Sequence, residues 1–249
     1  ILVTRFSPNN SKNMSSKDLR LTYDNIYSLN RISSKRNIEE GGSISIGIEY
    51  SIDDKQNNQI LNFKMANSIS DTKKNNLPTK SNLNEKRSDI VGELDFKPTN
   101  LLDINYNFSY DRDLKNSNYQ SISTNLNFNN FKTTFNYLSE DNEIGNTETV
   151  SNTSSYKFSE ENEISFNFTK NLKTDFTEYY NLTYQYQTDC LIASVKYTKE
   201  FYKDNSIMPD KSLLFYIRFI PFADLGYAFN PSSNQTSLPQ TSHELHDVE

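Results

Sequence analysis

Residues 43–50 read SISIGIEY, and their side chains alternate strictly in polarity. The even positions carry the large side chains Ile44, Ile46, Ile48 and Tyr50, whereas the odd positions are Ser43, Ser45, Gly47 and Glu49. A period of two is expected when successive side chains point to opposite faces of a sheet. The stretch therefore predicts a β-strand with one apolar face and one polar face.

The same alternation returns along the chain, most clearly in residues 102–110, 164–168 and 182–186. Helical periodicity is nearly absent. Alternation alone also suits a soluble sandwich with one solvated face, so a second feature has to separate the two folds. On this pattern we predict about twelve strands, which begin near Leu19, Ser43, Gln59, Asp89, Leu101, Gln120, Phe131, Val150, Glu163, Glu178, Leu191 and Ser212.

The second feature is the length of the connections between these strands. Short polar connections fall at residues 53–58, 97–100, 129–130, 160–162 and 187–190, and mostly longer ones alternate with them at 25–42, 70–88, 111–118, 139–147, 171–177 and 203–211. Transmembrane barrels have tight turns on the periplasmic side and longer loops outside. We therefore predict an all-β fold, an antiparallel transmembrane β-barrel of which this chain is a part with about 12 strands. A soluble all-β fold stays open as the alternative.

Composition agrees with a barrel. Only 34% of the 249 residues are hydrophobic and the mean hydropathy is -0.78, yet the chain carries 16 Tyr and 16 Phe. Disordered chains are poor in aromatic residues, and no stretch approaches the roughly 20 consecutive apolar residues that a membrane helix needs. The apolar rows would face lipid, and the polar rows would face a wet lumen.

Several function classes have no support in the sequence. The net charge is -6 and there is no basic stripe, so we expect no nucleic-acid partner. His243 and His246 lie in a polar tail far from Cys190, the single cysteine, so we expect no metal site. Acidic pairs such as Glu39 with Glu40 lie in expected loops and suit solvated charges. With no phosphate loop or nucleophile motif, we expect neither an enzyme nor a cofactor.

Four segments, in order along the chain, resemble one known family. Residues 23–50, YDNIYSLNRISSKRNIEEGGSISIGIEY, are similar to its loop and strand around an asparagine-arginine pair followed by an acidic residue and glycines. The other three are residues 86–94, residues 179–202 with a Cys in a hairpin turn, and residues 212–222, which resemble its terminal strand. The family is the lipopolysaccharide-assembly family LptD, also called OstA or Imp, in its C-terminal barrel region. The residues that carry the first match are Asn30, Arg31, Glu40, Gly41 and Gly42.

The resemblance implies a function in the outer membrane of a Gram-negative cell. A multi-pass barrel of this family would receive lipopolysaccharide (LPS) from the periplasmic Lpt bridge, through an N-terminal domain, and insert it into the outer leaflet among membrane lipid. The lipoprotein LptE would plug the barrel, and Cys190 would form a disulfide with the N-terminal domain. A porin-like or other outer-membrane transport barrel stays open as the alternative, and a soluble or adhesin-like β protein is a further one.

The chain begins at Ile1 without a signal peptide, and we expect it to be a fragment. Residues 1–18 are expected to be a partial strand or loop, residues 19–222 the barrel, and residues 223–249 a polar, disordered tail. Residues 212–222 would be the closing strand and one side of a lateral gate, because a weakly paired seam is the easiest place to open a sheet. The gate candidates are Leu213, Phe215, Ile217, Phe219 and Pro221.

Overall fold

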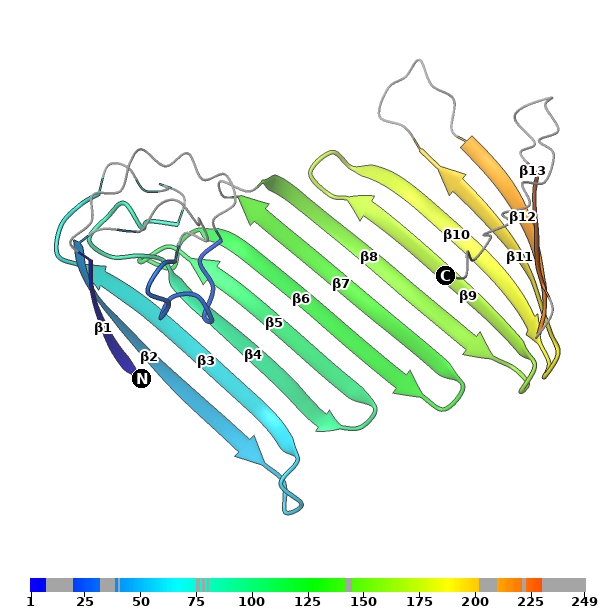
Figure 1. The fold of residues 1–249 in the computed structure, drawn as a ribbon, viewed down its shortest axis with the longest axis horizontal. Coiled ribbons are helices and arrows are strands. Elements are labelled where there is room, and N and C mark those ends of the chain that lie inside the picture. Colours follow the sequence, from blue (N-terminus) through cyan, green and yellow to red (C-terminus); the bar gives the residue numbers. More distant parts are fainter. Residues whose placement is uncertain are drawn as a thin grey trace, which may run out of the picture. The chain divides into compact units, whose positions relative to one another are not determined.

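The structure is a computed structural model that describes residues 1–7, 20–31, 39, 41–74, 77, 79, 81–141, 145–201 and 210–220, and the backbone of 223–229. Among these residues, no helix is long and apolar enough to cross a membrane. The described residues form one antiparallel sheet of thirteen strands in which chain neighbours are sheet neighbours (Figure 1). This confirms the all-β antiparallel fold.

The strands have the following bounds: β1 Leu2–Ser7, β2 Gly41–Asp53, β3 Gln59–Ser70, β4 Ile90–Thr99, β5 Leu102–Tyr110, β6 Ser117–Phe128, β7 Phe131–Asp141, β8 Asn146–Lys157, β9 Asn162–Asn171, β10 Phe176–Gln187, β11 Leu191–Glu200, β12 Asp210–Phe219 and β13 Ala223–Phe229. Most have 9 to 13 residues, close to the length with which a tilted strand crosses a bilayer.

The chain divides into two units. Unit 1 is residues 1–128, 133–151 and 171–175, and unit 2 is the remainder.

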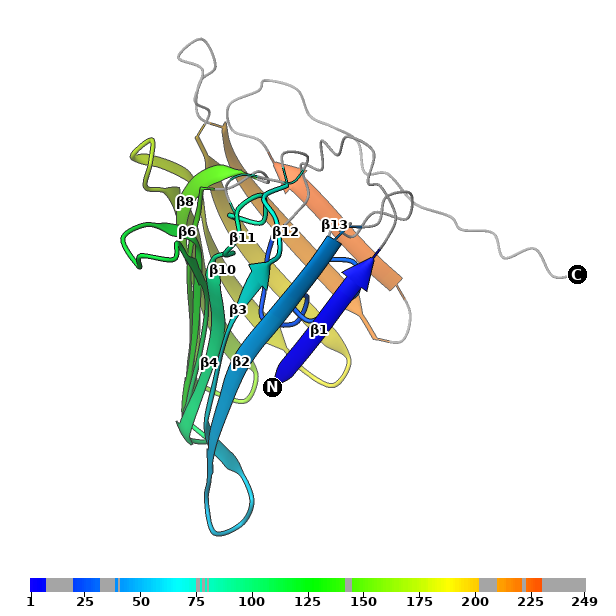
Figure 2. The same cartoon turned by 90° about the vertical axis from the view of Figure 1, so that its left-hand side faces the viewer.

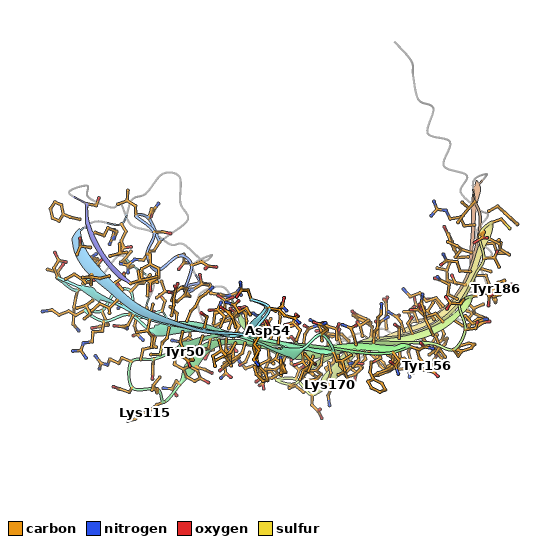
Figure 3. All side chains as sticks on the ribbon, turned by 90° about the horizontal axis from the view of Figure 1, so that it is seen from below. Tyr50, Asp54, Lys115, Tyr156, Lys170 and Tyr186 are labelled. Carbon is orange, nitrogen blue, oxygen red and sulfur yellow. The ribbon has the colours of Figure 1, made fainter. Side chains whose placement is uncertain are left out.

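In unit 1, burial is the reverse of that in a water-soluble sheet. The side chains of Ile44, Ile46 and Ile48 are 44%, 49% and 53% exposed, whereas Ser43 and Ser45 are 5% and 4% exposed. We call the face with the exposed isoleucines the outer face and the face with the buried serines the inner face. Tyr50 belongs to the outer face (Figure 3). An exposed apolar face this continuous is stable only against an apolar solvent such as lipid.

The buried apolar core of unit 1 lies against the inner face. Segment 20–31, drawn in dark blue, lies over the upper ends of β3 to β5 (Figures 1 and 2). The Ser45 hydroxyl donates a 2.9 Å hydrogen bond to the Ile26 carbonyl, which fixes this segment on β2. The core residues are Leu21, Tyr23, Ile26, Ala66, Leu77, Leu83 and Val91, with Tyr27 packed against them.

Unit 2 has an apolar row on one face. Cross-strand neighbours on β10, β11 and β12 place Leu182, Tyr197 and Leu213 in one line, and Tyr184, Val195 and Phe215 in the next. Polar side chains such as Thr183 and Lys196 occupy the alternate positions. We call the face with Leu182 and Tyr184 the outer face of unit 2. Tyr156 and Tyr186 also point to it (Figure 3).

The connections alternate in register as expected. The turns after β2, β4, β6, β8 and β10 lie at one end of the strands, and the connections after β1, β3, β5, β7, β9 and β11 lie at the other. The difference in length is large for the connections after β1, β3 and β11, while residues 172–175 after β9 form a four-residue turn. Asp54 stabilises the turn after β2 by accepting hydrogen bonds from the Gln56 and Asn58 backbone.

Two expectations about elements were wrong, at residues 20–31 and 223–229. No strand begins near Leu19, because the described residues 20–31 are extended or turn and pack on the inner face. Leu2–Ser7, in the part of the chain expected to be a partial strand or loop, is the six-residue strand β1. Ala223–Phe229, expected to be part of a disordered tail, is β13 and pairs with β12. Residues 230–249, with both histidines, lie outside the described residues.

Candidate functional site

A buried ionic cluster holds segment 20–31 on the inner face of unit 1. The Glu39 carboxylate accepts from Arg31 through both oxygens, with a distance of 2.8 Å from Nε to Oε2. It also accepts a 2.6 Å hydrogen bond from Arg5 and lies 3.4 Å from Lys74 Nζ. All four side chains are at most 5% exposed. We call Arg5, Arg31, Glu39 and Lys74 the inner cluster.

The inner cluster joins three parts of the chain that are distant in sequence. Arg5 belongs to β1, Arg31 and Glu39 to the connection from β1 to β2, and Lys74 to the connection from β3 to β4. The Arg5 guanidinium also donates to the Glu39 carbonyl at 2.8 Å, and Arg31 donates to the Ser68 hydroxyl at 2.5 Å. Each charge is therefore paired or hydrogen-bonded, as burial requires.

Electrostatics favour the ionised form of Glu39. Burial by itself would raise the pKa of its carboxyl group, but the hydrogen bond and charge of Arg31, followed by the charges of Arg5 and Lys74, hold that pKa below its usual value. Burial lowers the pKa of Lys74, and the nearby Glu39 carboxylate opposes this effect. Three cations around one carboxylate make Glu39 the member whose loss would leave the most uncompensated charge.

Gly41 and Gly42, two of the residues that carry the family resemblance, lie beside this cluster. Gly41 has a φ of +85°, a conformation that favours glycine, and the Gly42 N–H donates to the Asp71 carboxylate at 3.1 Å. Arg31, which also carries the resemblance, pairs with Glu39. Glu40 lies outside the described residues. Asn30 precedes Arg31 directly in the chain.

Segment 20–31 has a second attachment, at its start. Arg20 donates two hydrogen bonds to the Glu140 carboxylate of β7, at 2.9 and 2.5 Å. Its guanidinium carbon lies 4.2 Å from the ring centre of Tyr119 on β6, a cation–π contact. Glu140 is buried and Arg20 is one-third exposed. Sequence reasoning missed this pair, because no local pattern relates residues 120 positions apart.

A buried carboxylate without a cation fixes the end of the connection from β3 to β4. The Asp89 carboxylate accepts hydrogen bonds from Asn118 at 2.6 Å, Asn82 at 2.7 Å and Ser109 at 2.9 Å. Burial raises the pKa of this carboxyl group, and the neutral donors lower it only in part. Asp89 thus joins the connection to β5 and β6 through neutral hydrogen bonds, unlike the inner cluster.

At the short-turn end of unit 1, the inner face contains a polar cavity of about 750 Å³. Lys97 and Asp103, which both line it, form a 3.1 Å ion pair, and Asn105 donates to the lining residue Asp95 at 2.5 Å. Amides and carboxylates offer both donors and acceptors, the groups that hydrated sugars need. The polar lining residues are Asn57, Asn58, Gln59, Asp95, Lys97, Thr99, Asn100, Asp103, Asn125 and Asn127.

The structure also locates Cys190 and most of the gate candidates. Cys190 is an exposed free thiol in the short turn between β10 and β11. Leu213, Phe215, Ile217 and Phe219 all lie on the outer row of β12. Pro221 lies outside the described residues. β12 pairs with β11 on one side and with β13 on the other, so it is not the end strand of the sheet. In the described part of the chain, no group of three or more His, Cys, Asp or Glu could hold a metal.

A sheet with an apolar outer face, a polar inner face and antiparallel neighbours is typical of part of a transmembrane β-barrel of the outer-membrane type. The chain matches the family LptD, LPS transport system D, over residues 7–171, and it belongs to this family. It is therefore an outer-membrane β-barrel protein of LPS transport.

The likeness to solved structures is weak. A mutant of the Rhodopseudomonas blastica porin has a TM-score of 0.39 at 8% identity, with 76% of this chain and 84% of the porin covered. A triple mutant of the same porin has a TM-score of 0.40 at 8% identity and the same coverage. No curated protein matches the chain.

Proposed function

We propose that this chain is the barrel part of the translocon that inserts LPS into the outer leaflet. The observation that carries the proposal is the separation of the two faces in a chain of the LptD family. LPS joins a hydrated saccharide to apolar acyl chains. The saccharide would travel along the polar inner face, and the acyl chains would pass to the lipid that surrounds the outer face.

The polar cavity at the short-turn end supports the saccharide route. Its lining presents amides and an ion pair rather than apolar side chains, so a sugar can exchange hydrogen bonds with water for hydrogen bonds with protein. The opposite end of the inner face in unit 1 is covered by segment 20–31. Because the buried inner cluster holds this segment, we treat it as a fixed part of the lumen wall.

The exit for acyl chains would be a weakly paired seam of the complete barrel. β13 rather than β12 is the last described strand in the sheet order, so it would form one side of that seam. The outer-row side chains Leu213, Phe215, Ile217 and Phe219 would then lie one strand away from it.

The proposed partners are the lipoprotein LptE as the plug, and the periplasmic Lpt bridge through an N-terminal domain. The exposed Cys190 lies in a short turn, which faces the periplasm if the barrel has the usual orientation. Disulfides form in that compartment. We propose that Cys190 bonds to a cysteine of the N-terminal domain.

The test is complementation in a Gram-negative host whose own LptD is depleted. The complete protein that contains this chain should restore LPS on the cell surface, measured by its accessibility to a modifying enzyme added to intact cells. In non-reducing gels, a mobility shift that depends on Cys190 and is absent in the Cys190→Ser variant would support the disulfide. Passage of small solutes without LPS delivery would instead favour the porin-like alternative.

A further inference from the structure

Two lysines lie directly opposite each other on the outer face of unit 2. Lys199 of β11 and Lys211 of β12 are cross-strand partners. Each continues an apolar row: Ala193, Val195 and Tyr197 precede Lys199, and Leu213, Phe215, Ile217 and Phe219 follow Lys211. Side chains two positions apart share a face, so both lysines belong to the surface that faces lipid. Lys170 of β9 points to the same face (Figure 3).

Their position along the strands sets their height in the membrane. Both lie next to the connection from β11 to β12, at the end opposite the short turns. That end faces outward in a barrel of the usual orientation. Residues 211–219 of β12 are about as many as a tilted strand needs to cross the apolar band of such a barrel, roughly 9–11 residues. The lysines therefore lie at the level of the outer-leaflet headgroups.

Among the described residues, little neutralises the charge of this pair. Lys199 stacks on aromatic rings, 4.4 Å from the Phe201 centre and 5.7 Å from that of Tyr180. Lys211 is exposed and makes no ion pair with a described residue. Glu200 and Asp210, the next partners along the two strands, fall on the opposite face. Like charges directly opposite each other destabilise a sheet. An anion bound between the two lysines would therefore reduce their electrostatic repulsion.

We propose that Lys199 and Lys211 bind a phosphate of the lipid A headgroup of LPS at the outer-leaflet surface. Two ammonium groups on neighbouring strands can approach one phosphate from two sides, and the apolar rows below them can pack against the acyl chains of the same molecule. The choice of LPS rests on the proposed function. The site would hold newly delivered lipid beside β13, the strand that we assign to the exit seam.

The test uses the complete protein with its plug partner in nanodiscs of phosphatidylcholine with a small fraction of added lipid. Native mass spectrometry counts the retained molecules of diphosphorylated lipid A, dephosphorylated lipid A or phosphatidylglycerol. The variant is Lys199→Gln with Lys211→Gln. The matched control, Lys55→Gln with Lys132→Gln, removes the same charge at the short-turn end.

We expect the double variant to retain diphosphorylated lipid A less well by about fivefold for each lysine, and the control to match the unchanged protein. Retention of dephosphorylated lipid A should be low in all proteins. Equal retention by the double variant and the control would overturn the proposal. So would an equal preference for phosphatidylglycerol. LPS delivery in cells is scored separately: its absence in the unchanged protein refutes the proposed function, whatever the lipid retention.

Discussion

Arg31 and Glu39 form a paired ion contact from which solvent is completely excluded. The guanidinium donates to both carboxylate oxygens, and neither side chain has measurable exposure. Removal of one member of such a pair leaves a buried charge without compensation, which costs more than the pair contributes. The relationship makes Glu39 a sensitive position for mutation.

We predict that Glu39→Gln destabilises unit 1 by about 3–5 kcal/mol, because three cations lose their carboxylate. Chemical denaturation of the complete protein in detergent measures the change. The control is Glu85→Gln, which breaks an exposed 2.6 Å pair with Lys73 and should cost about 0–1 kcal/mol. Equal effects of the two substitutions would contradict the role of the inner cluster.

The pH dependence of stability should have two parts of opposite sign. Glu39 has a lowered pKa in the folded protein, so its contribution is present above its unfolded pKa and is lost as pH falls through the folded value. Asp89 has a raised pKa, so its contribution is present below its unfolded pKa and is lost as pH rises through the folded value. The free energy of unfolding should be measured between about pH 3 and pH 8. Glu39→Gln should remove the loss of stability on acidification, and Asp89→Asn should remove the loss of stability as the pH rises.

We predict that Gly47→Ala displaces Tyr27 from β2. A Cβ atom at residue 47 would lie 1.8 Å from the Tyr27 hydroxyl oxygen and 2.9 Å from the Met65 carbonyl oxygen. Limited proteolysis should then cleave segment 20–31 faster. Tyr27→Ala in the same chain removes the first of these clashes, so the double variant should recover part of the protection. No recovery would show that the backbone contact with Met65 dominates.

A charged side chain should destabilise the protein on the outer face but not on the inner face. Ile46→Lys places an ammonium group near the middle of an outer row and should destabilise folding into lipid vesicles by about 2–4 kcal/mol. Ser123→Lys, on the inner face opposite Asn105, should fold nearly as well as the unchanged protein. The folded fraction is measured by gel mobility without heating. If both variants fold equally, the assignment of the faces is wrong.

The orientation of the barrel can be tested with single cysteines in a Cys190→Ser background. We expect Lys115→Cys, in the connection from β5 to β6, to react in intact cells with a thiol reagent that does not cross membranes. Asn130→Cys, in the turn from β6 to β7, should react only after the outer membrane is permeabilised. The reverse pattern would invert the barrel and remove Lys199 and Lys211 from the outer leaflet.

The fold was largely predictable because alternation is a local signal. Residues 43–50 show it without interruption, and β2 contains them all. The prediction for segment 20–31 was wrong for the same reason: Leu21 and Tyr23 alternate with polar residues as in a strand, but both are buried in the core without forming a strand. β13 was missed because proline and polar residues around it suggested disorder. Local composition does not show that residues 223–229 can pair with β12.

The site was less predictable, since its contacts join distant residues. The resemblance drew attention to Arg31, Gly41 and Gly42, and the structure places them around one cluster. Arg5 and Lys74 complete this cluster from β1 and from the connection after β3. Neither position has a distinctive sequence context. The cross-strand register that places Lys199 opposite Lys211 depends on the length of the connection between the strands, which composition does not fix.

The pairing of Arg20 with Glu140 has a consequence for the order in which the chain assembles. Segment 20–31 is made early in synthesis, but Glu140 belongs to β7 and follows Arg20 by 120 residues. The Arg20 end of the segment can be fixed only after six further strands have joined β1, although Ser45 of β2 and the core residues of β3 and β4 contact the segment earlier. Until then this end stays loose, and partly assembled apolar surfaces favour aggregation. A periplasmic chaperone that delays collapse of this segment would therefore raise the yield of correctly assembled barrel.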